Sequence, residues 1–143
     1  MTPENQINNE TPARRLRVLV VDDQSAVCEV VADTIRYSGH EVVGMARDGV
    51  EAVAIAQQLR PDVVVMDISM PRMNGLEAMQ AILRAGTARW VMLMSGEYRS
   101  LGMRREDLLR QGASAFLEKP FNVDDLANLL QLWAKELTVK NWV

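Results

Sequence analysis

The 143-residue sequence predicts an α/β fold in which a parallel β-sheet carries helices on both faces. Two observations favour this fold. Short valine-rich apolar runs, such as Val63-Val64-Val65-Met66, are typical of parallel strands buried on both faces. Five such runs alternate with segments in which apolar residues recur every three or four positions, as they do in helices. This alternation of strands and helices indicates a doubly wound sheet.

Each predicted strand is an apolar run that ends at a polar or turn-forming residue. The five runs cover residues 16–21, 42–45, 63–67, 90–94 and 113–117. Glycine and proline separate these runs from the helical segments between them, at Gly39, Gly49, Pro61, Gly86 and Gly112.

The helical segments follow the strands in order. Apolar periodicity predicts helices near residues 27–35, 50–59 and 76–83, and a helix in the later half of 97–110. The last helix is expected to begin near Asn122, which can cap its first turn. Its predicted apolar stripe consists of Val123, Leu126, Leu130, Trp133 and Leu137.

Composition bounds the class of protein. The chain is 48% hydrophobic and 24% charged, which is typical of a globular domain. A net charge of −3 argues against a broad nucleic-acid-binding face, and no apolar run approaches the ~20 residues of a membrane span. A single cysteine, Cys28, excludes an intrachain disulfide and favours a cytoplasmic protein. We expect a disordered polar arm over 1–14, one domain over 15–138 and a short tail over 139–143.

Polar side chains collect where four of the strands end. Asp22 and Asp23 follow the first strand, Asp67 ends the third, Ser95 follows the fourth and Lys119 follows the fifth. Because the carboxyl ends of parallel strands share one edge of the sheet, these residues are expected to converge, and ligand chemistry in such sheets lies at this edge.

Three carboxylates that lie close together repel one another. At ~4 Å and an effective dielectric constant near 20, each pair costs about 4 kcal/mol. Lys119 offsets one charge, and oxygen-only ligands favour Mg²⁺ for the remainder. A carboxylate held in this way can act as a nucleophile toward a phosphoryl group, so we predict that Asp67 is the phosphoacceptor and that Ser95 donates a hydrogen bond after transfer.

These residues resemble the response-regulator receiver domain of bacterial two-component signalling. The matching stretches run from Val18 to Asp23, from Met66 to Glu77 and from Gly112 to Phe121, with Ser95 between them. The resemblance covers about residues 16 to 137, and it is specific because all of these pieces occur together. It implies a flavodoxin-like sheet with the strand order 2-1-3-4-5.

The resemblance also implies individual roles. Asp67 would accept the phosphoryl group from a histidine kinase or a histidine phosphotransfer protein. Asp22, Asp23 and the backbone carbonyl of Ser69 would bind Mg²⁺ together with Asp67. Lys119 would pair with the phosphoryl group, and its bond to Pro120 would be cis.

Two positions concern the response to phosphorylation. Ser95 and Phe116 would form the switch pair, in which the aromatic ring follows the serine inward. Many relatives have tyrosine where this chain has Phe116, so the ring must act here by packing alone. The side chains of Ser69 and Glu97, each two residues beyond a site residue, are candidates for tuning phosphoryl hydrolysis.

The resemblance favours a signalling switch over a turnover enzyme, with a downstream protein target and neither nucleic acid nor membrane as a direct partner. The output surface, and a dimer interface, are expected on the last helix-strand-helix portion, roughly residues 101 to 137. Two other interpretations stay open at this point. The chain could be the receiver part of a longer transcriptional regulator. A haloacid-dehalogenase-like phosphatase is less favoured, because Ser69 stands where that class has a second aspartate.

Overall fold

The computed structural model describes residues 14–142, and the segment 1–13, which holds most of the expected N-terminal arm, lies outside the described residues. Strands and helices alternate along the chain. In order they are β1 (Arg17–Val21), α2 (Ser25–Tyr37), β2 (Glu41–Ala46), α3 (Gly49–Leu59), β3 (Val63–Asp67), α4 (Gly75–Ala85), β4 (Trp90–Ser95), α5 (Arg105–Arg110), β5 (Ala115–Glu118) and α6 (Val123–Trp142).

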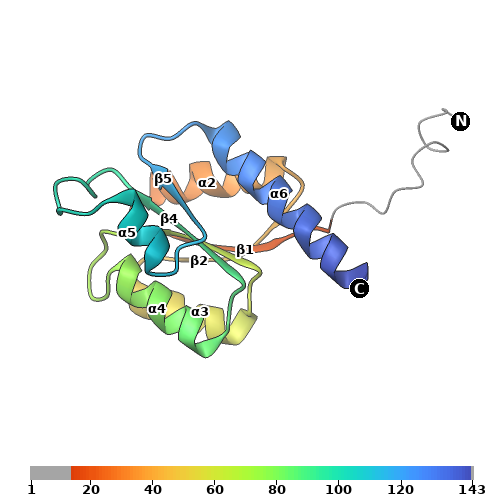
Figure 1. The fold of residues 1–143 in the computed structure, drawn as a ribbon, viewed down its shortest axis with the longest axis horizontal. Coiled ribbons are helices and arrows are strands. Elements are labelled where there is room, and N and C mark those ends of the chain that lie inside the picture. The colour runs from red at the N-terminus through yellow and green to blue at the C-terminus, as the bar shows by residue number, and fades with distance from the viewer. Residues whose placement is uncertain (1–13, 143) are drawn as a thin grey trace, which may run out of the picture.

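The five strands form one parallel sheet in the order β2-β1-β3-β4-β5, which confirms the predicted fold class and strand order. Helices α2 and α6 cover one face, and α3, α4 and α5 cover the other (Figure 1). All residues of β3 and β4 are buried, because these strands lie inside the sheet and have helices on both sides.

Local signals explain where several helices begin and end. Asn74 and Glu77 form a capping box at the start of α4, and Gly86 ends this helix in the left-handed conformation with φ of 67°. Before α6, Asn122 Oδ1 accepts a hydrogen bond from the Asp124 amide at 2.9 Å, as expected of a cap. Helix α5 occupies only the later half of its segment, as the sequence predicts.

The predicted stripe of α6 is correct except at its first member. Leu126, Leu130 and Trp133 are buried in the core between α6 and the sheet, where the Trp133 ring stacks on Trp90 at 5.4 Å. Val123 instead is 43% exposed and lines a surface groove beside Val30 of α2. The prediction failed there because the first turn of α6 lies over α2 rather than over the sheet.

The turn after β3 brings the start of α4 against the end of that strand. The Gly75 amide donates to the Ile68 carbonyl at 2.8 Å, and a Cβ atom at Gly75 would collide with the Asp67 carbonyl oxygen. Only glycine allows the helix to begin this close to the strand that ends in Asp67.

Gly75→Ala should therefore lower the free energy of unfolding by about 2 kcal/mol or more, because the helix must move away from the strand to admit the methyl group. Chemical denaturation measures the change. Gly44→Ala is the matched control, since a Cβ there would lie 3.4 Å from its nearest neighbours. Equal stabilities of the two variants would contradict this explanation.

Candidate phosphoacceptor and metal site

Three aspartates meet at the carboxyl edge of the sheet. Asp22 follows β1 and is buried, Asp67 is the last residue of β3 and is also buried, and Asp23 is exposed. Each offers a carboxylate oxygen, and these oxygens all lie within 4.8 Å of one another. The predicted convergence of the acidic residues is confirmed.

Lys119 lies between two of these carboxylates. Its Nζ atom is 2.6 Å from Asp22 Oδ2 and 3.1 Å from Asp67 Oδ1. Burial alone would lower the pKa of Lys119, but the hydrogen bond to Asp22 and the charge of Asp67 together raise it above its usual value. Lys119 therefore stays charged and ties the end of β5 to the ends of β1 and β3.

Burial raises the pKa of Asp67 to about 6. The charge of Lys119 opposes this rise, and the charges of Asp22 and Asp23 add to it. In the protein without a bound cation, the ionised form of Asp67 is thus held at a cost in free energy.

The donor set fits a hard divalent cation. With all three carboxylates ionised, Lys119 leaves an excess of two negative charges at the site. The side chains offer oxygen atoms rather than sulfur or imidazole nitrogen, which is the ligand chemistry of Mg²⁺ and Ca²⁺. The acidic cluster is therefore suited to a metal ion.

The loop that follows Asp67 is held from a neighbouring turn. Arg72 adopts a left-handed backbone conformation with φ of 67°, and its Nε atom donates to Asp48 Oδ2 at 2.8 Å. Asp48 also caps α3, and the Gly49 amide donates to the Met73 carbonyl at 3.0 Å. These contacts fix the loop that carries Ser69.

The strand-end serine is buried beside the site. The Ser95 hydroxyl accepts a hydrogen bond from the Glu97 amide at 3.0 Å, and the Glu97 side chain is exposed. The Lys119 amide donates to the Ser95 carbonyl at 2.9 Å, and the bond from Lys119 to Pro120 is cis, as expected. The ends of β4 and β5 are thus joined next to Asp67.

Phe116 contacts an aromatic residue that the sequence analysis did not single out. Phe116 is buried, and its ring meets Tyr98 edge-on with the centroids 4.6 Å apart. The Tyr98 hydroxyl lies 3.1 Å from Glu118 Oε1, and Arg99 Nε donates to the same hydroxyl at 3.1 Å. A tyrosine three residues after Ser95 was the available signal, but its partner Glu118 lies twenty positions further along the chain.

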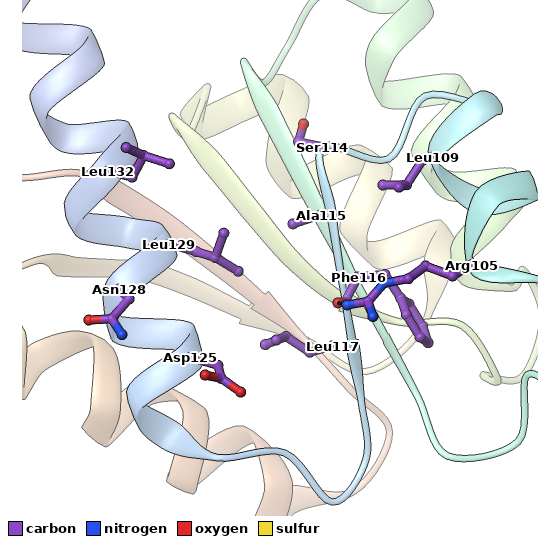
Figure 2. A pocket seen from close by; sticks show the side chains of 10 residues that line it. All are labelled: Arg105, Leu109, Ser114, Ala115, Phe116, Leu117, Asp125, Asn128, Leu129 and Leu132. Atoms are coloured by element: carbon purple, nitrogen blue, oxygen red, sulfur yellow. Dashed lines mark hydrogen bonds between the residues drawn. The ribbon is translucent and has the colours of Figure 1, made fainter.

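A groove of about 500 Å³ runs along β5 between α5 and α6 (Figure 2). Leu109 of α5 and Leu129 and Leu132 of α6 contribute apolar lining, and Arg105 and Asp125 add opposite charges. Arg105 reaches from α5 to Phe116, donates to its carbonyl at 2.9 Å and lies with its guanidinium carbon 5.7 Å from the ring centroid.

An acidic cluster beside a lysine, at the carboxyl edge of a parallel sheet with the strand order 2-1-3-4-5, is the arrangement expected of a phosphoacceptor signalling module. Comparison with known proteins agrees with this assignment. Residues 18–131 match the family described as the response regulator receiver domain. The chain belongs to this family. A receiver domain is a phosphoacceptor switch and not a turnover enzyme.

Individual relatives differ in length. The transcriptional regulatory protein PdtaR of Mycobacterium tuberculosis is 39% identical over 116 residues, which is 81% of this chain and 55% of that protein. This chain therefore spans about half the length of PdtaR. The chemotaxis protein CheY of Listeria monocytogenes is 34% identical over 122 residues, which is 84% of this chain and 99% of CheY.

One chain in a solved complex of CheX and CheY with BeF3 and magnesium from Borrelia burgdorferi has the same fold. It aligns with a TM-score of 0.71 and 27% identity, covering 82% of this chain and 86% of that one. Among the described residues of this chain, 14–142, no helix is both long and apolar enough to cross a membrane.

The raised pKa of Asp67 predicts how stability depends on pH when divalent cations are removed. The folded protein binds the Asp67 proton more tightly than the unfolded chain, so this residue costs no stability below its ordinary pKa of 3.8. The cost grows as the pH rises and is complete above about 6. Asp67→Asn should therefore stabilise the EDTA-treated protein at pH 7.5 by about 1–3 kcal/mol.

Denaturant unfolding of both proteins at several pH values measures the gain, which should shrink toward zero near the ordinary pKa of an aspartate. A gain that does not depend on pH would show that Asp67→Asn acts through packing and not through the charge.

Proposed function

We propose that Asp67 accepts a phosphoryl group from a phosphohistidine on a histidine kinase or a histidine phosphotransfer protein. One observation carries the proposal: Asp67 belongs to the acidic cluster and contacts Lys119, at the edge of the sheet where ligands bind. Family membership supports the same role.

The transfer is a substitution at phosphorus. A carboxylate oxygen of Asp67 forms a bond to phosphorus while the bond from phosphorus to the imidazole nitrogen of the donor breaks, and the electron pair of that bond stays on the nitrogen. Lys119, already 3.1 Å from Asp67 Oδ1, offers positive charge to the transferred oxygens. The product is an acyl phosphate on Asp67 and a histidine on the donor.

We propose Mg²⁺ as the cofactor, held by Asp22, Asp23, Asp67 and the backbone carbonyl of Ser69. The excess of negative charge and the all-oxygen donors support it, as does the magnesium in the solved CheX–CheY complex. When bound, the ion neutralises charge on the phosphoryl oxygens. Asp23 is exposed, so a cation can reach the site from solvent.

Ser95 and Phe116 would transmit the change, with Ser95 donating a hydrogen bond to a transferred oxygen. Glu97 is exposed and Ser69 is half-buried, so both side chains are open to the water that hydrolyses the acyl phosphate. We propose that they set the lifetime of the phosphorylated form.

We propose that a downstream protein reads the surface formed by α5, β5 and α6. The groove along β5 supports this, since it combines exposed leucines with charges of both signs (Figure 2). A dimer through the same face, in the cytoplasm, fits this proposal. Residues 15–138 would act as the switch unit, either as a protein the size of CheY or as the receiver part of a longer regulator such as PdtaR.

Incubation with acetyl phosphate and Mg²⁺, followed by intact mass measurement, tests the proposal. We expect one added phosphoryl group on the wild type and none on Asp67→Asn, because Asp22, the other buried carboxylate that contacts Lys119, is fully shielded from solvent, whereas Asp67 keeps 6% exposure. Full labelling of Asp67→Asn would contradict Asp67 as the acceptor. Rapid release of phosphate without an adduct would favour a phosphatase instead.

Lys119→Met should slow phosphorylation by acetyl phosphate by about 10²-fold, because the transferred oxygens lose their positive partner. Some labelling should remain, since Asp67 itself is unchanged. Lys135→Met is the matched control, because Lys135 is exposed on α6, away from the strand ends. Time courses of intact mass measure both rates, and equal rates in the two variants would contradict a role for Lys119.

A further inference from the structure

Tyr98 is buried in a loop that is otherwise largely exposed. The loop spans residues 96–103, between β4 and α5, and Tyr98 is only 7% exposed. Its ring meets Phe116 at an interplanar angle of 67°, and its hydroxyl donates to Glu118 Oε1 and accepts from Arg99 Nε, both at 3.1 Å. The side chain therefore fastens this loop to β5 by one apolar contact and one polar contact.

The polar contact lies next to the residues that would hold the phosphoryl group. Tyr98 is three positions after Ser95, and Glu118 directly precedes Lys119. The hydroxyl of Ser95 is engaged with the Glu97 amide, in the same loop as Tyr98. A change at Ser95 thus reaches Tyr98 through one hydrogen bond, to the Glu97 amide, and the peptide bond that joins Glu97 to Tyr98.

Phe116 cannot provide such a polar contact. It has no hydroxyl, it is only 2% exposed, and Arg105 covers its carbonyl and its ring (Figure 2). The Phe116 ring is already buried while Ser95 still accepts from Glu97. The Tyr98 hydroxyl, unlike the Phe116 ring, makes a side-chain hydrogen bond to β5 that can open.

We propose that Tyr98 is the positioning residue that couples Ser95 to the output surface: its bond to Glu118 holds the 96–103 loop closed until phosphorylation turns Ser95 away from Glu97. This rests on the proposed function. As the loop shifts, the Tyr98 hydroxyl leaves Glu118, and both groups become hydrated.

Opening would change the surface that a partner meets. The side chains of Arg99 and Glu118 are 77% and 50% exposed, so their ion pair is a weak one that water can replace. Together with Tyr98, Arg104 and Arg105, they line a polar hollow of about 410 Å³ beside α5. Release of Tyr98 redistributes charge in this hollow, next to the groove along β5.

Tyr98→Phe tests the coupling, with beryllofluoride in excess Mg²⁺ as a stand-in for the phosphoryl group. A contact made only in the closed form opposes binding, so its removal must tighten binding. We expect Tyr98→Phe to bind beryllofluoride more tightly than the wild type by up to about fivefold, the equivalent of one hydrogen bond. Titrations followed by fluorine NMR measure the affinity. A variant that merely loosened the fold would gain no affinity.

Hydrogen exchange of the 96–103 amides provides the second readout. In the wild type, beryllofluoride should speed exchange of this loop by about fivefold, and in Tyr98→Phe the loop should exchange fast from the outset. Tyr37→Phe is the matched control, because Tyr37 is 95% exposed on α2 and should behave as wild type. Glu118→Gln keeps an acceptor for the hydroxyl and should also behave as wild type, whereas Glu118→Ala should reproduce Tyr98→Phe.

Equal or weaker beryllofluoride affinity in Tyr98→Phe and in Glu118→Ala would overturn the role of Tyr98. So would a loop response in both that matches the wild type. If the wild type binds beryllofluoride, either of these results leaves the proposed phosphoacceptor function of Asp67 intact. Failure of the wild type to bind beryllofluoride at all would overturn both proposals.

Discussion

Repulsion among Asp22, Asp23 and Asp67 is the constraint around which this end of the molecule is built. Their oxygens lie within 4.8 Å of one another, and Lys119 bridges two of them. Burial makes the charge on Asp67 more costly still and raises its pKa to about 6. A site with this excess of negative charge favours ligands that bring positive charge, such as a metal ion. An anionic phosphoryl group can approach these carboxylates only when such positive charge offsets their repulsion.

The fold holds these groups in place by rigid elements around them. Asp67 ends a strand whose residues are all buried, and Gly75 allows α4 to start against that strand end. Arg72 and Asp48 fix the loop after Asp67 from the turn before α3. On the other side, the buried Tyr98 fastens the loop after Ser95 to Glu118, whose side chain is 50% exposed. Side-chain hydrogen bonds thus hold the loops on both sides of Asp67.

Much of this arrangement could be predicted from the sequence, because it depends on local patterns. Valine-rich runs mark buried strands, and polar residues at their ends must meet at one edge of a parallel sheet, which identified Asp67 and Lys119. Contacts between side chains that are far apart in the sequence leave no such local pattern in it. Tyr98 and Glu118 meet only through the packing of a loop on β5, and Asp48 meets Arg72 across two turns. Val123 was misplaced for the same reason, since periodicity does not tell which neighbour a helix covers.

Calorimetric titration with Mg²⁺ tests the central claim most directly, namely that the crowded carboxylates form a site for a cation. We predict binding of one ion per chain at neutral pH, with affinity lowered by about tenfold or more in Asp23→Asn, where an exposed charge is removed without disturbing the core. An absence of saturable heat with the wild type, or an unchanged affinity in Asp23→Asn, would contradict it.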